Sequence, residues 1–174
     1  MIGDLSVLFG LKSTGIYRAL SHIETLRIPE ILFKEFVHRN KLTEQLKKTH
    51  EITEFLKQTW LFGECISSPV QSQIAQNMPL NNYSKGEKII YDGLMLLKEG
   101  KVELSGLKSC RSPNNHFISK GDFWGGENMI TSETSKILAK AVTRAKVYSI
   151  TNTEILKQIP IIRWKLLEQS QKRV

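Results

Sequence analysis

The side chains that most often carry catalytic or metal chemistry are scattered in this sequence of 174 residues. The histidines and cysteines are His22, His38, His50, His116, Cys65 and Cys110. Zinc sites need such ligands in closely spaced pairs, and none occurs here. There is also no Gly-x-Ser-x-Gly turn that would expose a nucleophilic serine. The sequence therefore predicts no metal site, no disulfide framework, no bound cofactor and no catalytic centre.

Two stretches join a glycine to an acidic residue and carry hydroxyl or basic side chains further along. The first consists of Gly3 and Asp4, with Ser13 and Thr14. The second consists of Gly126, Glu127 and Asn128, with Ser135 and Lys136. A carboxylate in the first turn of a helix is stabilised by the helix dipole, so Glu127 has a structural explanation as well as a functional one. The glycines of residues 121–126 precede no Gly-Lys-Ser/Thr, which excludes a nucleoside triphosphate loop.

Positive charge is concentrated in the second part of the chain. Residues 1–75 carry 9 Lys/Arg and 8 Asp/Glu, a net charge of +1, whereas residues 76–174 carry 16 and 9, a net charge of +7. Such a surface attracts anions, although lysines also simply keep a surface solvated. No apolar run approaches the roughly 20 residues that span a bilayer. The N-terminus lacks the basic start of a signal peptide, and we expect a cytoplasmic protein.

The elements that must position these stretches change type along the chain. We expect short strands over residues 3–28, with a half-buried strand over 22–28, because apolar and polar residues alternate there. Residues 29–78 have helical spacing after Pro29, and helix returns from residue 154. Between them, residues 81–150 consist of short apolar pieces separated by glycines: 88–91, 94–97, 102–104 and 147–150. This pattern favours a small antiparallel roll or barrel.

The sequence also repeats itself at a long period. Gly3 begins a stretch that reaches Ala19 and then Ile28, and Gly126 begins one that reaches Ala141 and then Ile150. The offset is 126 − 3 = 123 at the glycines and 141 − 19 = 122 at the alanines, so one deletion accounts for the difference. A period of this size indicates a duplicated domain, because solenoid repeats are roughly 20–50 residues long.

Several of these segments resemble the cyclic nucleotide-binding domain family, the β-roll sensor of cyclic-AMP receptor proteins, cyclic-nucleotide-dependent kinases and gated channels. The segments that carry the resemblance are Phe55-Leu56, Leu61-Phe62, Ile66, Ile74-Ala75, residues 83–93, 99–104 and 121–127, and Pro160. The resemblance implies an α+β fold, an antiparallel β-roll or jelly roll flanked by N-terminal and C-terminal helices. It also implies two domains: residues 51–174 form a nearly complete second copy, and residues 1–50 form the back half of a first copy and its helix.

In that family, the phosphate-binding cassette is a short helix whose N-terminus faces a cyclic phosphate. A Glu of a Gly-Glu pair holds the ribose, and an Arg nine positions later pairs with the phosphate. The resemblance places Glu127 and Asp4 at the Glu position in the two copies. Counting back from Ala141 places Ser135 at the Arg position, with Lys136 beside it, and Ser13 takes this position in the first copy. Neither copy supplies the guanidinium that grips phosphate by two parallel hydrogen bonds.

The resemblance therefore implies a non-catalytic regulatory or sensor module whose cassette is degenerate. Its ligand would be a cyclic nucleotide or another small anion, and its partner another protein or a second copy of the chain. Half a β-roll exposes unpaired edges, so we expect residues 1–28 to be poorly ordered, packed against the second domain or completed by another chain. The alternative is a basic nucleic-acid-binding protein that uses residues 76–174, with nucleic acid as the less favoured partner.

Overall fold

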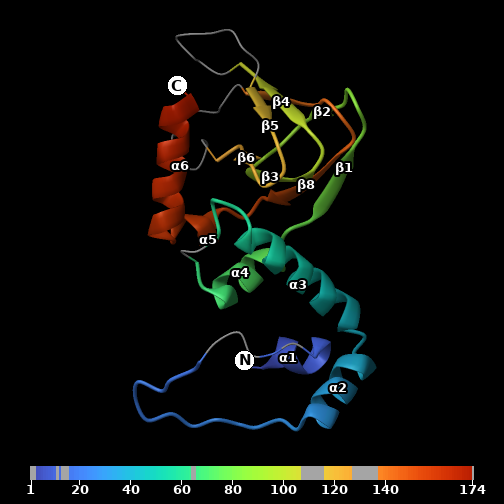
Figure 1. The fold of residues 1–174 in the computed structure, drawn as a ribbon, viewed down its shortest axis with the longest axis vertical. Helices are drawn as coiled ribbons and strands as arrows, with labels where there is room; N and C mark the ends of the chain where they lie inside the picture. Colours follow the sequence, from blue (N-terminus) through green and yellow to red (C-terminus); the bar gives the residue numbers. More distant parts are fainter. Residues whose placement is uncertain are drawn as a thin grey trace. The chain divides into compact units, whose positions relative to one another are not determined.

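In the computed structural model of this chain, residues 51–174 form a β-roll with helices packed against one of its sheets (Figure 1). The residues that it describes are 3–10, 12, 16–63, 66–106, 116–126 and 137–173. They divide into two units, residues 1–50 and residues 51–174. The helices are α1 (Asp4–Phe9), α2 (Glu30–Arg39), α3 (Thr43–Lys57), α4 (Ser68–Ala75), α5 (Glu154–Lys157) and α6 (Pro160–Arg173). Among the described residues, none of the helices is long and apolar enough to cross a membrane.

Residues 1–50 are helical where they have regular structure. Gly3 and Gly10 both adopt left-handed backbone conformations at the two ends of α1, and Phe9 of that helix stacks on His50. The strands predicted for residues 3–28 are wrong over α1 and absent over 16–28, where the described backbone forms no strand. A strand needs hydrogen-bonding partners on a neighbouring strand, and the described part of residues 1–50 contains none.

Residues 51–174 form the predicted roll from two antiparallel sheets. The strands are β1 (Leu80–Tyr83), β2 (Lys88–Ile89), β3 (Leu94–Glu99), β4 (Val102–Ser105), β5 (His116–Ile118), β6 (Phe123–Trp124), β7 (Leu138–Ala141) and β8 (Ala145–Ile150). One sheet has the order β1-β8-β3-β6 and the other has β2-β7-β4-β5. Each observed pair is antiparallel, which confirms the predicted fold class.

The sheet that contains β3 and β8 is buried on both faces. Met95 and Leu97 point into the core between the two sheets, whereas Leu94 and Leu96 face the helices. This explains the unbroken apolar run in β3, because alternate side chains of a strand point to opposite faces and here both faces are covered. Strand β8 repeats the arrangement, with Val147 between the sheets and Tyr148 against the helices.

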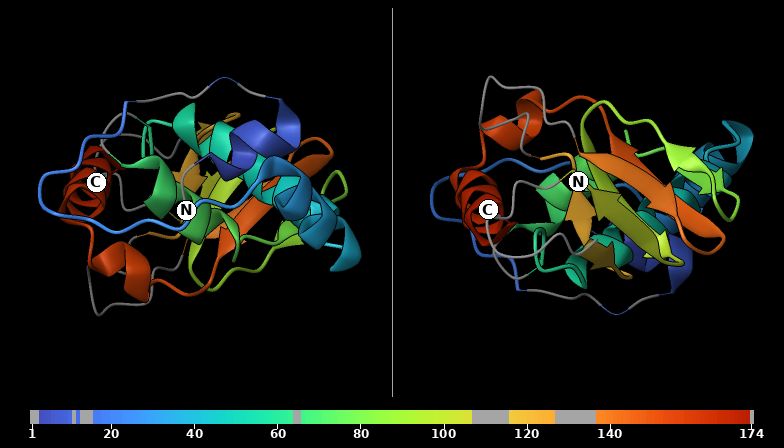
Figure 2. Two further views of the ribbon diagram at one scale, coloured as in Figure 1. Left: turned by 90° about the horizontal axis from the view of Figure 1, so that it is seen from below. Right: turned by 90° about the horizontal axis from the view of Figure 1, so that it is seen from above.

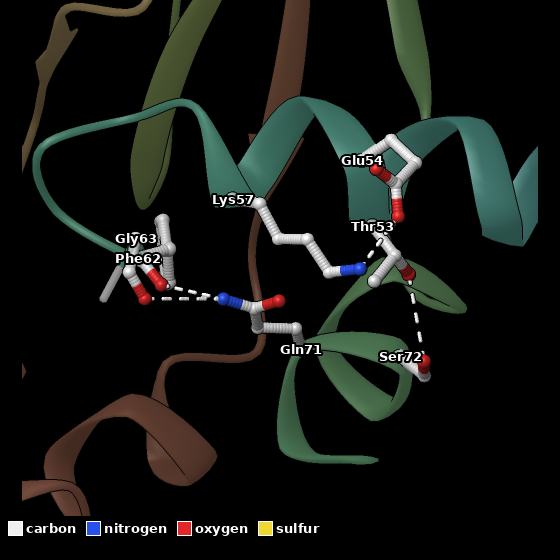
Figure 3. Close-up of polar contacts among 7 residues, drawn as sticks. All are labelled: Thr53, Glu54, Lys57, Phe62, Gly63, Gln71 and Ser72. Atoms are coloured by element: carbon white, nitrogen blue, oxygen red, sulfur yellow. Dashed lines mark hydrogen bonds and ion pairs between the residues drawn. The ribbon is translucent and has the colours of Figure 1, made fainter. Parts of the chain in front are cut away.

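The helices that cover this sheet are α4, α5, α6 and the end of α3 (Figures 1 and 2). The buried amide of Gln71 on α4 fixes the connection after α3, because its Nε2 donates to the carbonyl oxygens of Phe62 at 2.6 Å and Gly63 at 3.4 Å (Figure 3). Thr53 and Ser72 bring their hydroxyls within 3.5 Å between the same two helices. These contacts set the helical layer against which α6 closes.

Candidate functional site

The candidate site lies where β6 ends and the second glycine-acid stretch begins. Gly125 has φ +81°, a left-handed conformation that suits glycine. A Cβ at this position would lie 2.9 Å from the Tyr91 ring and would collide with the carbonyl of Gly93. Gly93 is equally confined against the carbonyl of Ile150 at the end of β8. The chain is therefore packed backbone against backbone at this end of the roll.

Gly126 is buried directly beneath helix α6. A Cβ on it would lie 2.5 Å from Cδ2 of Leu166 and 3.2 Å from Cδ1 of Leu94. Since real Cβ contacts essentially never fall below 3.0 Å, a side chain at this position would require the Leu166 side chain to shift. Leu166 is itself buried, and the closing helix thus reaches the start of the predicted cassette.

A second contact holds α6 beside the roll. Lys165 is buried, and its Nζ donates to the carbonyl oxygen of Trp60 while lying 5.1 Å from the centroid of the Trp60 ring. Trp60 in turn stacks on Phe123 of β6, with centroids 6.2 Å apart and planes at 2°. A charge-assisted hydrogen bond and a cation–π contact therefore link α6 to the strand that leads into the site.

A pocket of about 250 Å³ lies along this contact. Its lining residues are Trp60, Gly121, Asp122, Phe123 and Gln169. Ligand pockets are commonly about 300–1,000 Å³, so this one suits a small molecule or ion better than a nucleotide. In the described part of the chain, no group of three His, Cys, Asp or Glu side chains could hold a metal ion.

Tyr91 and Trp124 form an aromatic pair near the site that the sequence pattern did not predict. Trp124 is completely buried and packs in the core between the two sheets. The Tyr91 ring meets it edge-on, with centroids 6.3 Å apart, and the Tyr91 hydroxyl donates to the carbonyl of Ile137 at 3.1 Å. The buried Nε1 of Trp124 has no hydrogen-bond partner among the described residues. Tyr91 lies 33 residues before Trp124 in the sequence, so no local pattern connects them.

The structure describes only part of the predicted cassettes. In the second stretch it describes Gly126, whereas Glu127, Asn128, Ser135 and Lys136 lie outside the described residues. In the first stretch Gly3 caps α1 and Asp4 is its first residue, whereas Ser13 and Thr14 lie outside the described residues. The roles predicted for all these residues stay predictions.

Comparison with known proteins supports the fold described above. No protein-family model and no curated protein matches the sequence. Solved structures of cyclic nucleotide-binding domains match the fold at low identity. The regulatory subunit of a cAMP-independent protein kinase A from Trypanosoma cruzi, bound to guanosine, has a TM-score of 0.60 at 19% identity, covering 80% of this chain and 53% of that one.

Two further structures give the same result. The regulatory domain of Toxoplasma gondii protein kinase A with cAMP has a TM-score of 0.63 at 15% identity, over 82% of this chain and 56% of that one. The sensor domain of the transcriptional regulator DNR from Pseudomonas aeruginosa has a TM-score of 0.58 at 16% identity, over 72% and 89%. The chain thus spans about half the length of the two kinase regulatory structures. The matched structures are regulatory or sensor domains.

Proposed function

We propose that residues 51–174 form a non-catalytic regulatory module whose nucleotide cassette is degenerate and is closed by its own helix α6. The observation that carries the proposal is the contact between Leu166 and Gly126, because it fills the space that a ligand-binding side chain would occupy. The likeness of the fold to regulatory and sensor domains supports the regulatory role.

Glycine conformations favour an alignment of the two copies one residue earlier than the sequence alone suggested. Gly3 and Gly125 have nearly equal φ values of 85° and 81°, whereas Gly126 lies outside the left-handed region. The offset is then 125 − 3 = 122, which equals the offset of 141 − 19 = 122 between Ala19 and Ala141. No deletion is needed in this alignment.

In this alignment, Gly126 rather than Glu127 stands opposite Asp4. Ser135 then follows Gly126 by nine positions, the spacing that the family resemblance implies for the arginine. The second copy would thus lack both the ribose carboxylate and the phosphate guanidinium. Charge-assisted hydrogen bonds contribute roughly 1.5–3 kcal/mol each, so the loss of both predicts very weak binding of cyclic nucleotides.

The regulatory step in this proposal is a movement of α6. A partner or a small anion that separates Leu166 from Gly126 would favour a displaced position of α6. A ligand that leaves the two residues in contact would favour the closed position of α6. Either ligand acts only through its different affinity for the two helix positions. Lys165 holds the closed position by its bond to Trp60.

Residues 1–50 would be the back half of a first copy in the same proposal. The short helix α1 directly after Gly3 matches the cassette helix that the resemblance implies. The helices α2 and α3 follow Ile28, as α5 and α6 follow Ile150.

Calorimetric titration of the full chain with cyclic AMP and cyclic GMP tests the degenerate cassette. We expect no binding heat up to about 1 mM for the natural chain. The triple variant Gly126→Glu, Ser135→Arg, Leu166→Ala restores the missing groups and makes room for them, and we expect it to bind at least tenfold more tightly. Leu166→Ala alone is the matched control. Near-micromolar binding by the natural chain that Glu127→Ala abolishes would overturn the proposal.

A further inference from the structure

An extended apolar segment of residues 16–28 lies in solvent. Its exposed apolar side chains are Ile16, Tyr17, Leu20, Ile23, Leu26 and Ile28. Burial of such apolar surface favours association in proportion to the area removed from water. Apolar surface on this scale usually marks a contact with another protein segment.

The internal repeat identifies which strands this segment corresponds to. At the offset of 122, residues 16–19 correspond to β7 and residues 23–28 correspond to β8. Strand β7 lies between β2 and β4, and β8 lies between β1 and β3. Both are central strands, so each needs a hydrogen-bonding partner on both sides. The counterparts of these partners are missing from the described part of residues 1–50.

Three of the four β7 positions keep their character at this offset, and the exception is the buried Ala139, whose counterpart is Tyr17. On β7 the outward side chains are Leu138 and Lys140, and their counterparts are the apolar Ile16 and the basic Arg18. The inward position Ala141 has the identical counterpart Ala19.

The correspondence continues along β8. Tyr148 and Ile150 face the helical layer, and their counterparts are the large apolar residues Leu26 and Ile28. A chain that only needed a soluble linker would not keep large apolar side chains at both positions.

We infer that residues 16–28 become two central strands of a second β-roll when they are partnered, and that the partner is a polypeptide segment carrying the front half of such a roll, with strands equivalent to β1, β2, β3 and β4. The inference rests on the duplicated domain in the proposed function but not on any ligand of residues 51–174. The chemistry of recognition is backbone hydrogen bonding along both strands together with burial of Leu26 and Ile28.

Two matched variants test this partner surface. Ile16 is 100% exposed and Leu26 is 98% exposed, so replacing either by Glu leaves the stability of the natural chain unchanged. Their counterparts in the roll differ in exposure. Leu138, the counterpart of Ile16, is 67% exposed, whereas Tyr148, the counterpart of Leu26, is 2% exposed. A completed second roll would therefore accept Ile16→Glu and reject Leu26→Glu.

To supply the front half, a second copy of residues 79–124 is placed directly before Gly3 in the full chain. Hydrogen exchange is then measured over residues 16–28. We expect exchange there to slow about a hundredfold or more relative to the unextended chain. Leu26→Glu should abolish the slowing and Ile16→Glu should preserve it. Urea unfolding of residues 51–174 serves as the check that each variant is folded.

Three outcomes would overturn the inference. The first is unchanged exchange in residues 16–28 of the extended chain, and the second is an equal loss of protection in both variants. The third is strong protection of this segment in the unextended chain, which would mean that it already has its partners. None of these readouts depends on nucleotide binding, so a failure here is distinct from a failure of the closed-cassette proposal.

Discussion

Residues 138–150 and residues 16–28, which the predicted repeat aligns at an offset of 122, have different structures. The first stretch forms β7 and β8 in the middle of two sheets, and the second is an exposed chain without strands. Local propensity is similar in both, so the difference comes from the strands available on either side. A β-strand here is a property of the sheet that surrounds it rather than of its own residues.

The largest expected difference in stability is between substitutions at Tyr148 and at Leu26, two positions that the offset of 122 aligns. Tyr148→Glu places a charge in the core against the helices, next to the Phe55 ring whose centroid is 5.4 Å from that of Tyr148. We expect the free energy of unfolding to fall by about 3 kcal/mol or more, because the buried ring is lost and a carboxylate is desolvated, with the Lys98 ammonium, 5.3 Å from the Tyr148 ring centroid, offsetting part of the cost. Leu26→Glu should change it by less than about 0.5 kcal/mol.

Urea denaturation followed by tryptophan fluorescence measures both variants, since all three tryptophans lie in residues 51–174. Equal destabilisation by the two substitutions would contradict the comparison, because it would mean that Leu26 is buried in the folded chain.

Substitutions at Gly126 and Leu166 should have an intermediate effect on the stability of the protein. Gly126→Ala introduces a Cβ 2.5 Å from the Leu166 side chain, and overpacking of this kind costs about 1–3 kcal/mol. Leu166→Ala creates space at the same point, so the destabilisation of the double variant should be smaller than the sum for the two single variants. Thermal unfolding of the natural chain, the two single variants and the double variant measures the coupling, and strict additivity would show that Leu166 does not confine Gly126.

Asp4→Ala changes the position of the first copy that the repeat aligns with Gly126. It should lower the free energy of unfolding by less than about 1 kcal/mol, the usual contribution of an acid at a helix N-terminus, and thermal unfolding measures this as well.

The roll was predictable because its signals are local. Gly93 and Gly100 bound the apolar run of β3, and Gly100 and Gly106 likewise flank β4. The strands β5, β6 and β7 were not among the predicted pieces, and the helix α1 was predicted as a strand, because a short apolar triplet such as Val7-Leu8-Phe9 fits either structure.

The candidate site was less predictable than the fold. The order of segments identified the glycine-acid stretch, and Gly126 does lie at the end of β6. Its contact with Leu166 joins residues 40 positions apart and depends on where α6 packs, so no spacing in the sequence reveals it. Positive φ at Gly125 is likewise a property of the folded backbone, and it supports a shift of the cassette alignment by one residue.

The smallest expected effect concerns the ion pair that joins β3 to β8. Glu99 and Lys146 are cross-strand neighbours, and their charged groups lie 2.8 Å apart. The hydrogen bond from Lys146 holds the pKa of the Glu99 carboxyl below its ordinary value. A carboxyl with a lowered pKa in the folded state stabilises the protein above its unfolded pKa, and this contribution is lost as the pH falls through the folded pKa.

Glu99→Gln should therefore lower the melting temperature slightly near neutral pH, and the difference from the natural chain should disappear as the pH falls through the lowered pKa of Glu99. The effect is small because both groups are solvent-exposed. Glu24→Gln is the matched control, because Glu24 is the counterpart of Lys146 at the offset of 122 and lies in the segment without strands. A pH-dependent difference of the same size for Glu24→Gln would contradict the view that only the paired strands of residues 51–174 contribute to this stability.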